Sequence, residues 1–131
     1  MGQTQLLMIV LAVIIVGIAV AVGISQLSDS ALAGNRDALT LDCQTVVSKA
    51  QGWYRKPVSL GGGGNSFTNF TLAKSGTDAT NANGTIAVLS AADGTFTVKC
   101  TGTENASSGD KVFVQLAYTA SNDSTAYSDN M

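Results

Sequence analysis

The sequence contains no histidine, and this absence removes the commonest acid–base catalyst and the commonest metal ligand together. Charged residues are also few, and the formal net charge is −2, whereas a nucleic-acid-binding face requires a surplus of positive charge. The sequence shows no nucleophile–base pair, no cluster of metal ligands and no paired carboxylates. We therefore expect no enzymatic activity, no metal or other cofactor, and no nucleic-acid-binding site.

The stretch from Leu6 to Ile24 lacks both charge and proline. It reads LLMIVLAVIIVGIAVAVGI, and as a helix it would span roughly 28 Å, close to the ~30 Å hydrocarbon core of a bilayer. A helix satisfies its backbone hydrogen bonds internally, so this segment can lie in a membrane. A cleaved signal peptide is a weaker interpretation, because the apolar run is long and the first cation, Arg36, follows it instead of preceding it.

The helix is expected to continue beyond the apolar stretch, because residues 25–54 contain no proline. When helical angles are counted from Cys43, the residues around it form an apolar stripe. The stripe consists of Leu32, Leu39, Val46, Val47, Ala50, Trp53 and Tyr54. The opposite side is small or apolar instead of charged, and consists of Ala38, Leu41, Thr45, Ser48 and Gly52. A helix with two non-polar sides is expected to have two partners, its own domain and a neighbouring molecule.

Pro57 is expected to end the helix, since the residue before a proline is disfavoured in the α conformation. A helix from about residue 3 to about residue 55 is roughly 80 Å long. This length exceeds the diameter of a domain of about a hundred residues, so the N-terminal part must project. We divide the chain into a projecting apolar helix, residues 1–27, and a globular head, residues 28–131. Arg36 shares the side of the stripe, and we expect it to lie beyond the packed part of the head.

The remainder of the chain has the patterns of a small antiparallel sheet. Gly61 to Gly64 form a flexible connector, and Asp93-Gly94 is a strong hairpin signal. The expected strands are Phe67 to Ala73, Thr85 to Ala91, Thr95 to Thr101 and Lys111 to Thr119. The polar stretches 75–84 and 102–110 and the tail 120–131 are expected to be surface coil, with room for one more edge contact in the tail. The fold class is therefore α+β, a long helix whose C-terminal half packs on a three- to four-stranded antiparallel sheet.

The two cysteines fall on the two faces that are expected to meet. Cys43 lies in the middle of the helical stripe, and Cys100 shares the apolar face of its strand with Phe96 and Val98. We predict a Cys43–Cys100 disulfide that joins helix to sheet, with two buried free thiols as the alternative. A disulfide also agrees with an oxidising, extracytoplasmic location.

The N-terminal residues resemble those of a known family. Leu-Leu-Met-Ile-Val at residues 6–10, followed by Ala12, Ile14, Ile15 and Gly17, resembles the N-terminal segment of type IV pilins. The order of apolar half-helix, amphipathic half-helix and small sheet is also similar to that family. Type IV pilins usually have a glutamate at the fifth mature position. That position is Gln5 if Met1 is the mature N-terminus, as we favour, and Leu7 if a prepilin peptidase cuts after Gly2.

The resemblance implies a structural subunit that polymerises with copies of itself into an extracellular helical filament. It also implies that the subunit is inserted in the inner membrane before the pilus assembly machinery, and in some cases a prepilin peptidase, acts on it. The residues that would mediate self-assembly are Gln5, Leu6, Leu7, Met8, Ile9, Val10, Leu11, Val13, Ile14, Ile15, Gly17, Ile18, Val20, Val22, Ile24 and Leu27. The alternatives are a single-pass, membrane-anchored surface protein with a small β binding domain, and a minor pilin or pseudopilin of a secretion system.

Four asparagines match the acceptor pattern for N-glycosylation. They are Asn69, Asn83, Asn105 and Asn122. Several matches arise by chance in a chain rich in Ser, Thr and Asn, so polar loops without a glycan are the favoured interpretation.

Overall fold

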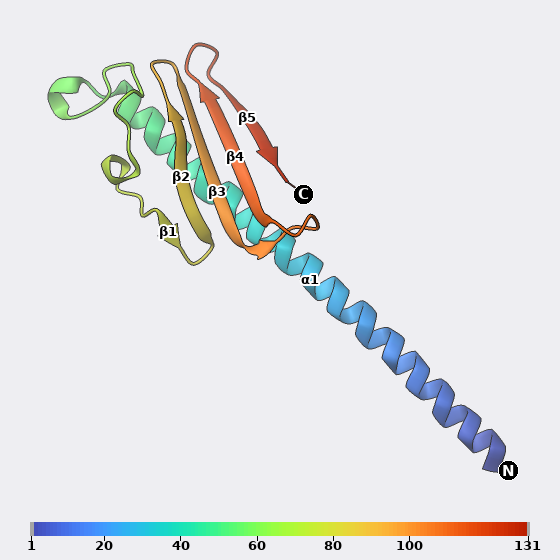
Figure 1. Cartoon of the computed structure of the whole chain (residues 1–131). Coiled ribbons are helices and arrows are strands. Elements are labelled where there is room, and N and C mark those ends of the chain that lie inside the picture. Colours follow the sequence, from blue (N-terminus) through green and yellow to red (C-terminus); the bar gives the residue numbers. More distant parts are fainter. Residues whose placement is uncertain (1, 131) are drawn as a thin grey trace.

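The computed structural model describes residues 2–130 and contains one long helix packed against a five-stranded antiparallel sheet. The fold class is therefore α+β, as the sequence predicts. Figure 1 shows the helix extending far out of the head, with the sheet along its C-terminal half only. The sheet has five strands, so the prediction of three or four was wrong.

Helix α1 runs from Gly2 to Arg55, close to the predicted bounds. Its N-terminal part has no buried residue up to residue 30, and the buried positions begin in the second half. These are Leu39, Cys43, Val46, Val47 and Ala50. All five belong to the predicted stripe or to its centre, so the amphipathic period correctly identified the face that the sheet covers.

The segment that follows α1 forms two short 3₁₀ helices, η1 (Val58–Leu60) and η2 (Leu72–Ser75). The predicted strand Phe67 to Ala73 was therefore wrong. Phe67 and Phe70 are both buried, and the amide of Phe70 donates to the carbonyl of Phe67 at 2.8 Å. Residues three apart point to opposite faces of a strand. A turn brings both rings into the same core, and this is why no strand forms here.

The strands are β1 (Thr80–Asn81), β2 (Gly84–Ala91), β3 (Thr95–Asn105), β4 (Lys111–Thr119) and β5 (Ser124–Asp129). They pair in chain order, each antiparallel to the next. β2, β3 and β4 correspond to predicted strands, although β3 continues past Thr101 to Asn105. β1 and β5 come from stretches that were expected to be coil, because their exposed polar residues lack an alternating apolar pattern.

The core lies between the second half of α1 and the inner face of β3 and β4. Phe96, Val98 and Cys100 of β3 are fully buried. Opposite them on β4 lie Tyr118, Leu116 and Val114, and Val112 of the same strand is buried as well. At the end of the head farthest from residue 2, the ring of Phe67 contacts three other aromatic rings, with centroid distances of 4.6 to 5.9 Å.

A disulfide joins Cys43 of α1 to Cys100 of β3, across a sequence separation of 57. Both cysteines are fully buried, in the centre of the helix–sheet contact. This pairing is the one that the two cysteine-bearing faces predict.

Candidate self-assembly surface

The projecting half of α1 is covered with exposed apolar side chains. The large ones between Leu6 and Leu27 are each exposed by 53 to 72%. The sixteen predicted self-assembly residues, from Gln5 to Leu27, all lie on this half, spread over every side of the helix. The predicted residues therefore lie together on one continuous part of α1 that the head does not cover (Figure 1).

This half is long and apolar enough to cross a membrane. Its most apolar window has a mean hydropathy of 3.2, and no part of that window is buried. Because a helix pairs its own backbone groups, the stretch from Leu6 to Ile24 presents only uncharged, apolar side chains to its surroundings. Such a surface is stable in lipid or against other apolar helices, and unfavourable in water.

The second half of α1 has an exposed side as well, opposite the sheet. Leu41 is 64% exposed there, and the exposed Thr45 and Ser48 lie on the same side. The two hydroxyls donate to the carbonyls of residues four earlier, each at 2.9 Å. The helix therefore offers an uncharged outer face along the head in addition to its projecting half.

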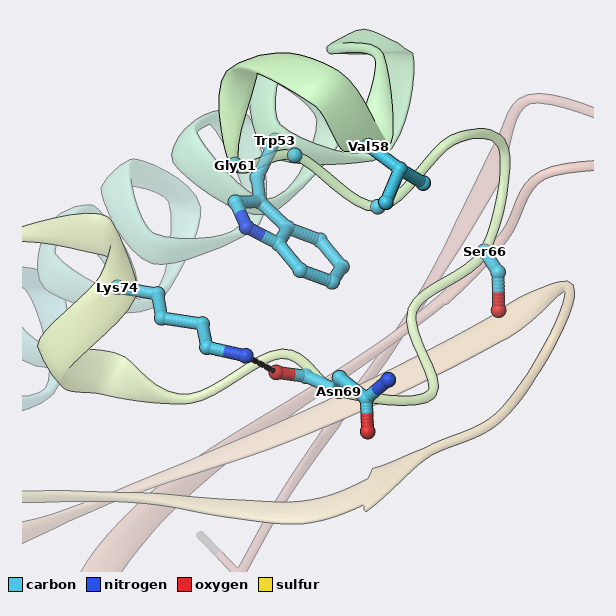
Figure 2. Close-up of a pocket in the computed structure, with 8 residues that line it drawn as sticks. Trp53, Val58, Gly61, Ser66, Asn69 and Lys74 are labelled. Carbon is cyan, nitrogen blue, oxygen red and sulfur yellow. Dashed lines mark hydrogen bonds between the residues drawn. The ribbon is translucent and has the colours of Figure 1, made fainter.

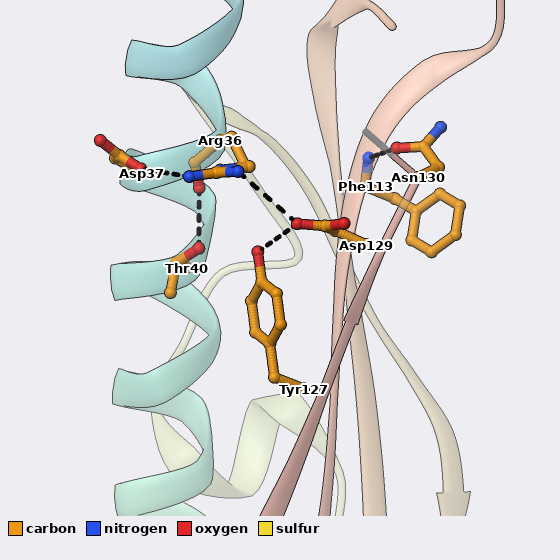
Figure 3. Close-up of polar contacts among 7 residues, drawn as sticks. All are labelled: Arg36, Asp37, Thr40, Phe113, Tyr127, Asp129 and Asn130. Atoms are coloured by element: carbon orange, nitrogen blue, oxygen red, sulfur yellow. Dashed lines mark hydrogen bonds and ion pairs between the residues drawn. The ribbon is translucent and has the colours of Figure 1, made fainter. Parts of the chain in front are cut away.

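A polar cluster fixes the C-terminal strand to α1 where the helix leaves the head. Arg36 Nη1 lies 3.7 Å from Asp129 Oδ2, and the same oxygen accepts a 2.6 Å hydrogen bond from Tyr127 Oη (Figure 3). The expectation that Arg36 lies beyond the packed part of the head was therefore wrong. Its partner Asp129 could not be inferred from the sequence, because β5 itself was not predicted.

Asn130 extends this cluster along the outer edge of the sheet. Its Oδ1 accepts from the amide of Phe113 at 2.9 Å, and its Nδ2 donates to the carbonyl of Lys111 at 3.0 Å. Burial, followed by the hydrogen bond to Asp129, raises the pKa of Tyr127 above its ordinary value. Polar contacts thus hold β5 in place where apolar packing is lacking.

The candidate glycosylation sites differ in their surroundings. Asn83 is half-buried, and its Nδ2 donates to Asp42 Oδ2 at 2.9 Å, while Asn81 donates to the same oxygen. The other three, Asn69, Asn105 and Asn122, are exposed. The amide of Asn83 therefore serves to hold the β1–β2 turn against α1.

A shallow hollow of about 360 Å³ lies at the far end of the head, beside Trp53 and the glycine-rich loop (Figure 2). A Cβ atom on Gly63 would lie 2.5 Å from the indole ring, so glycine lets the loop pack against that ring. Lys74 Nζ lies 5.5 Å from the indole centroid and donates to the carbonyl of Asn69. Among the described residues that line the hollow, Lys74 is the one with a charge, so the lining offers no acid–base pair.

Comparison with known proteins gives no match: no family model, no curated protein and no solved structure is similar to this chain. The functional interpretation therefore depends on the geometry of the chain alone.

Proposed function

We propose that this protein is the structural subunit of an extracellular helical filament, similar to a type IV pilus, that assembles through the projecting half of α1. The observation that supports this most is the exposed, uncharged surface from Leu6 to Leu27, attached to a head with its own disulfide-linked core. A surface of this kind cannot remain in water, and copies of the same helix are suited to cover it.

The energetics favour such assembly. Burial at ~25 cal/mol per Å² over roughly 1,500 Å² of helix surface gives tens of kcal/mol before the costs of association are subtracted. The Ala, Val, Ile and Gly residues of this half allow close approach of helices. Before assembly the same half would be held in the inner membrane, where the assembly machinery, and a prepilin peptidase if the chain is processed, would act on it.

Removal of detergent from the purified full-length protein tests the proposal. We expect fibres in negative-stain images, and we expect Ile14→Lys to prevent their formation because it places a charge in the apolar surface. Leu89→Lys is the matched control, since Leu89 is a 54% exposed apolar residue on the head. A soluble monomer with the apolar half intact would contradict the proposal.

A single-pass anchored surface protein is the second candidate. It is favoured by the length of the apolar half, which matches one bilayer crossing. In that case the protein would remain monomeric in detergent and would form amorphous aggregates, with no fibres, when the detergent is removed.

A further inference from the structure

The C-terminal strand β5 is attached to the head without taking part in its core. Its residues are exposed, apart from the half-buried Asp129 at its end. Among residues 2–130, neither the buried core nor the partly buried apolar side chains packed against it include a residue of β5. Figure 1 shows β5 at the outer edge of the sheet, beside β4. Detachment of β5 would therefore remove no buried apolar side chain from the core.

An open groove lies between α1 and β5. It has a volume of about 410 Å³, and its lining includes Val47 of α1, Leu116 of β4, and Thr125 and Tyr127 of β5. Because no side chain fills this space, the inner side of β5 lacks the close packing that would hold it against the helix. The attachment of β5 must come from other contacts.

The first of these contacts is the antiparallel ladder to β4. It runs from the pair Thr119–Ser124 to the pair Val114–Asp129. Beyond the end of the ladder, the side chain of Asn130 makes two hydrogen bonds with the backbone of β4. The other edge of β5 pairs with no strand among the described residues, so water reaches these bonds from the open side.

The second contact joins the C-terminal end of β5 to α1 through Arg36. Arg36 Nη1 lies 3.7 Å from Asp129 Oδ2, the oxygen that also accepts the hydrogen bond from Tyr127 (Figure 3). Arg36 Nη2 lies 3.5 Å from Asp37 of the same helix. The pair with Asp129 therefore connects two elements, whereas the pair with Asp37 stays within α1.

The guanidinium of Arg36 is incompletely paired when β5 is closed. Its Nε is buried and has no hydrogen-bond partner within the described chain. Opening of β5 would give this N–H group access to water, so the closed state gains less from Arg36 than from a fully paired guanidinium. A contact of this kind can be released more easily than a buried, fully bonded one.

The other end of β5 is fixed to the core. Tyr118 Oη donates to Asp123 Oδ1 at 2.7 Å in the turn that joins β4 to β5, and Tyr118 itself is buried. The turn also contains the left-handed backbone of Asp123, whose φ is 49°. Since this turn is held in place, β5 would open from its C-terminal end.

We propose that β5 opens as a unit from its C-terminal end while the rest of the head stays folded, with the contact between Arg36 and Asp129 as the latch. Opening exposes the outer edge of β4 and the groove beside α1. Free backbone groups at a sheet edge can pair with another extended segment, so the latch controls access to this edge. The inference concerns the head alone and does not depend on the proposed filament.

Hydrogen exchange of the full-length protein in mild detergent, measured by mass spectrometry, tests the opening. We expect the amides of residues 124–130 to exchange about tenfold or more faster than those of residues 96–101 in β3, which require opening of the core. Salt at about 1 M, where the Debye length is about 3 Å, should raise the first rate several-fold and leave the second unchanged. Equal rates in the two segments would overturn the separate opening of β5.

Arg36→Gln tests the latch, because it removes the charge that pairs with Asp129. We expect exchange of residues 124–130 to become several-fold faster, with residues 96–101 unchanged. Asp37→Asn is the matched control, since it removes the other carboxylate beside Arg36 and should not accelerate exchange in β5. Arg36→Lys retains the charge and should restore most of the protection. An unchanged rate in Arg36→Gln, or an equal rise in both segments, would overturn the latch.

Cleavage by chymotrypsin gives an independent measure. The protease cuts after aromatic residues in locally opened chain, and Tyr127 is the aromatic residue of β5. We expect residues 128–131 to be released several-fold faster from Arg36→Gln than from Asp37→Asn, while the aromatic residues of the core remain uncut. Equal release from the two variants would contradict the role of Arg36.

Discussion

The hydroxyl of Tyr118 connects the end of β4 to the turn that follows it. Tyr118 Oη donates to Asp123 Oδ1 at 2.7 Å, and the residue is only 5% exposed. This hydrogen bond, with burial as the second cause, raises the pKa of Tyr118 above its ordinary value of 10.0. Both effects favour the neutral phenol, so the folded head is more stable when this group is protonated.

The pKa shift predicts how stability depends on pH. The contribution of Tyr118 is complete below the unfolded-state pKa near 10 and is lost as the pH rises through the higher folded-state pKa. We expect the free energy of unfolding to fall as the pH rises above the ordinary tyrosine pKa of about 10, and to fall less in Tyr118→Phe. Urea denaturation of the protein in mild detergent across this range measures the effect. An equal fall in the variant would show that this hydroxyl is not the cause.

Among the elements, those with strong apolar periods could be predicted from the sequence. The stripe around Cys43 and the alternation in β3 and β4 identified both faces of the core and hence the disulfide. β5 has no such pattern, because an exposed edge strand is held by the ladder to β4 and by polar contacts through Asp129. The strand predicted from Phe67 to Ala73 was wrong because a turn, and no alternating strand, brings Phe67 and Phe70 into the same core.

The apolar candidate surface could be predicted from the sequence, whereas the polar contacts that hold the head together could not. The apolar half is recognisable from composition alone, since every side of the helix has the same character. The contacts of Arg36 with Asp129, and of Asp42 with Asn83, join residues far apart in the chain and follow no local pattern. They depend on the register between sheet and helix, which only the folded chain defines.

The disulfide between α1 and β3 is expected to contribute much of the stability of the head. In the chain-entropy model, closing a loop with a separation of 57 stabilises the fold by about 4 kcal/mol. We expect Cys43→Ala with Cys100→Ala to lower the free energy of unfolding by about that amount, measured by urea denaturation in mild detergent. Adding reductant should then have no further effect on the variant. A loss well below 1 kcal/mol would contradict the prediction.

At the scale of the whole molecule, the core and the exposed apolar surface lie on different parts of α1. The buried residues begin at Leu39, and the partly buried Leu32 is the first that packs against them. The projecting half contributes nothing to this core. The head should therefore fold without it.

A fragment of residues 28–131 tests this division. We expect it to be soluble without detergent, monomeric and disulfide-bonded, because it retains the whole core and loses the large apolar surface. Analytical ultracentrifugation and a thiol assay measure both properties, with the full chain as the comparison. A fragment that aggregates or exposes two thiols would show that the head depends on the projecting half.

The position of the disulfide also determines how the chain would respond to mechanical load. A pull applied between the two ends of the chain passes along α1 to Cys43 and crosses directly to Cys100. The segment between Cys43 and Cys100 forms a closed loop, which the load bypasses. It contains the glycine-rich loop, both 3₁₀ helices and the first two strands, and these cannot be drawn out while the bond is intact. The extension available under tension is therefore limited to the segments on either side of that loop.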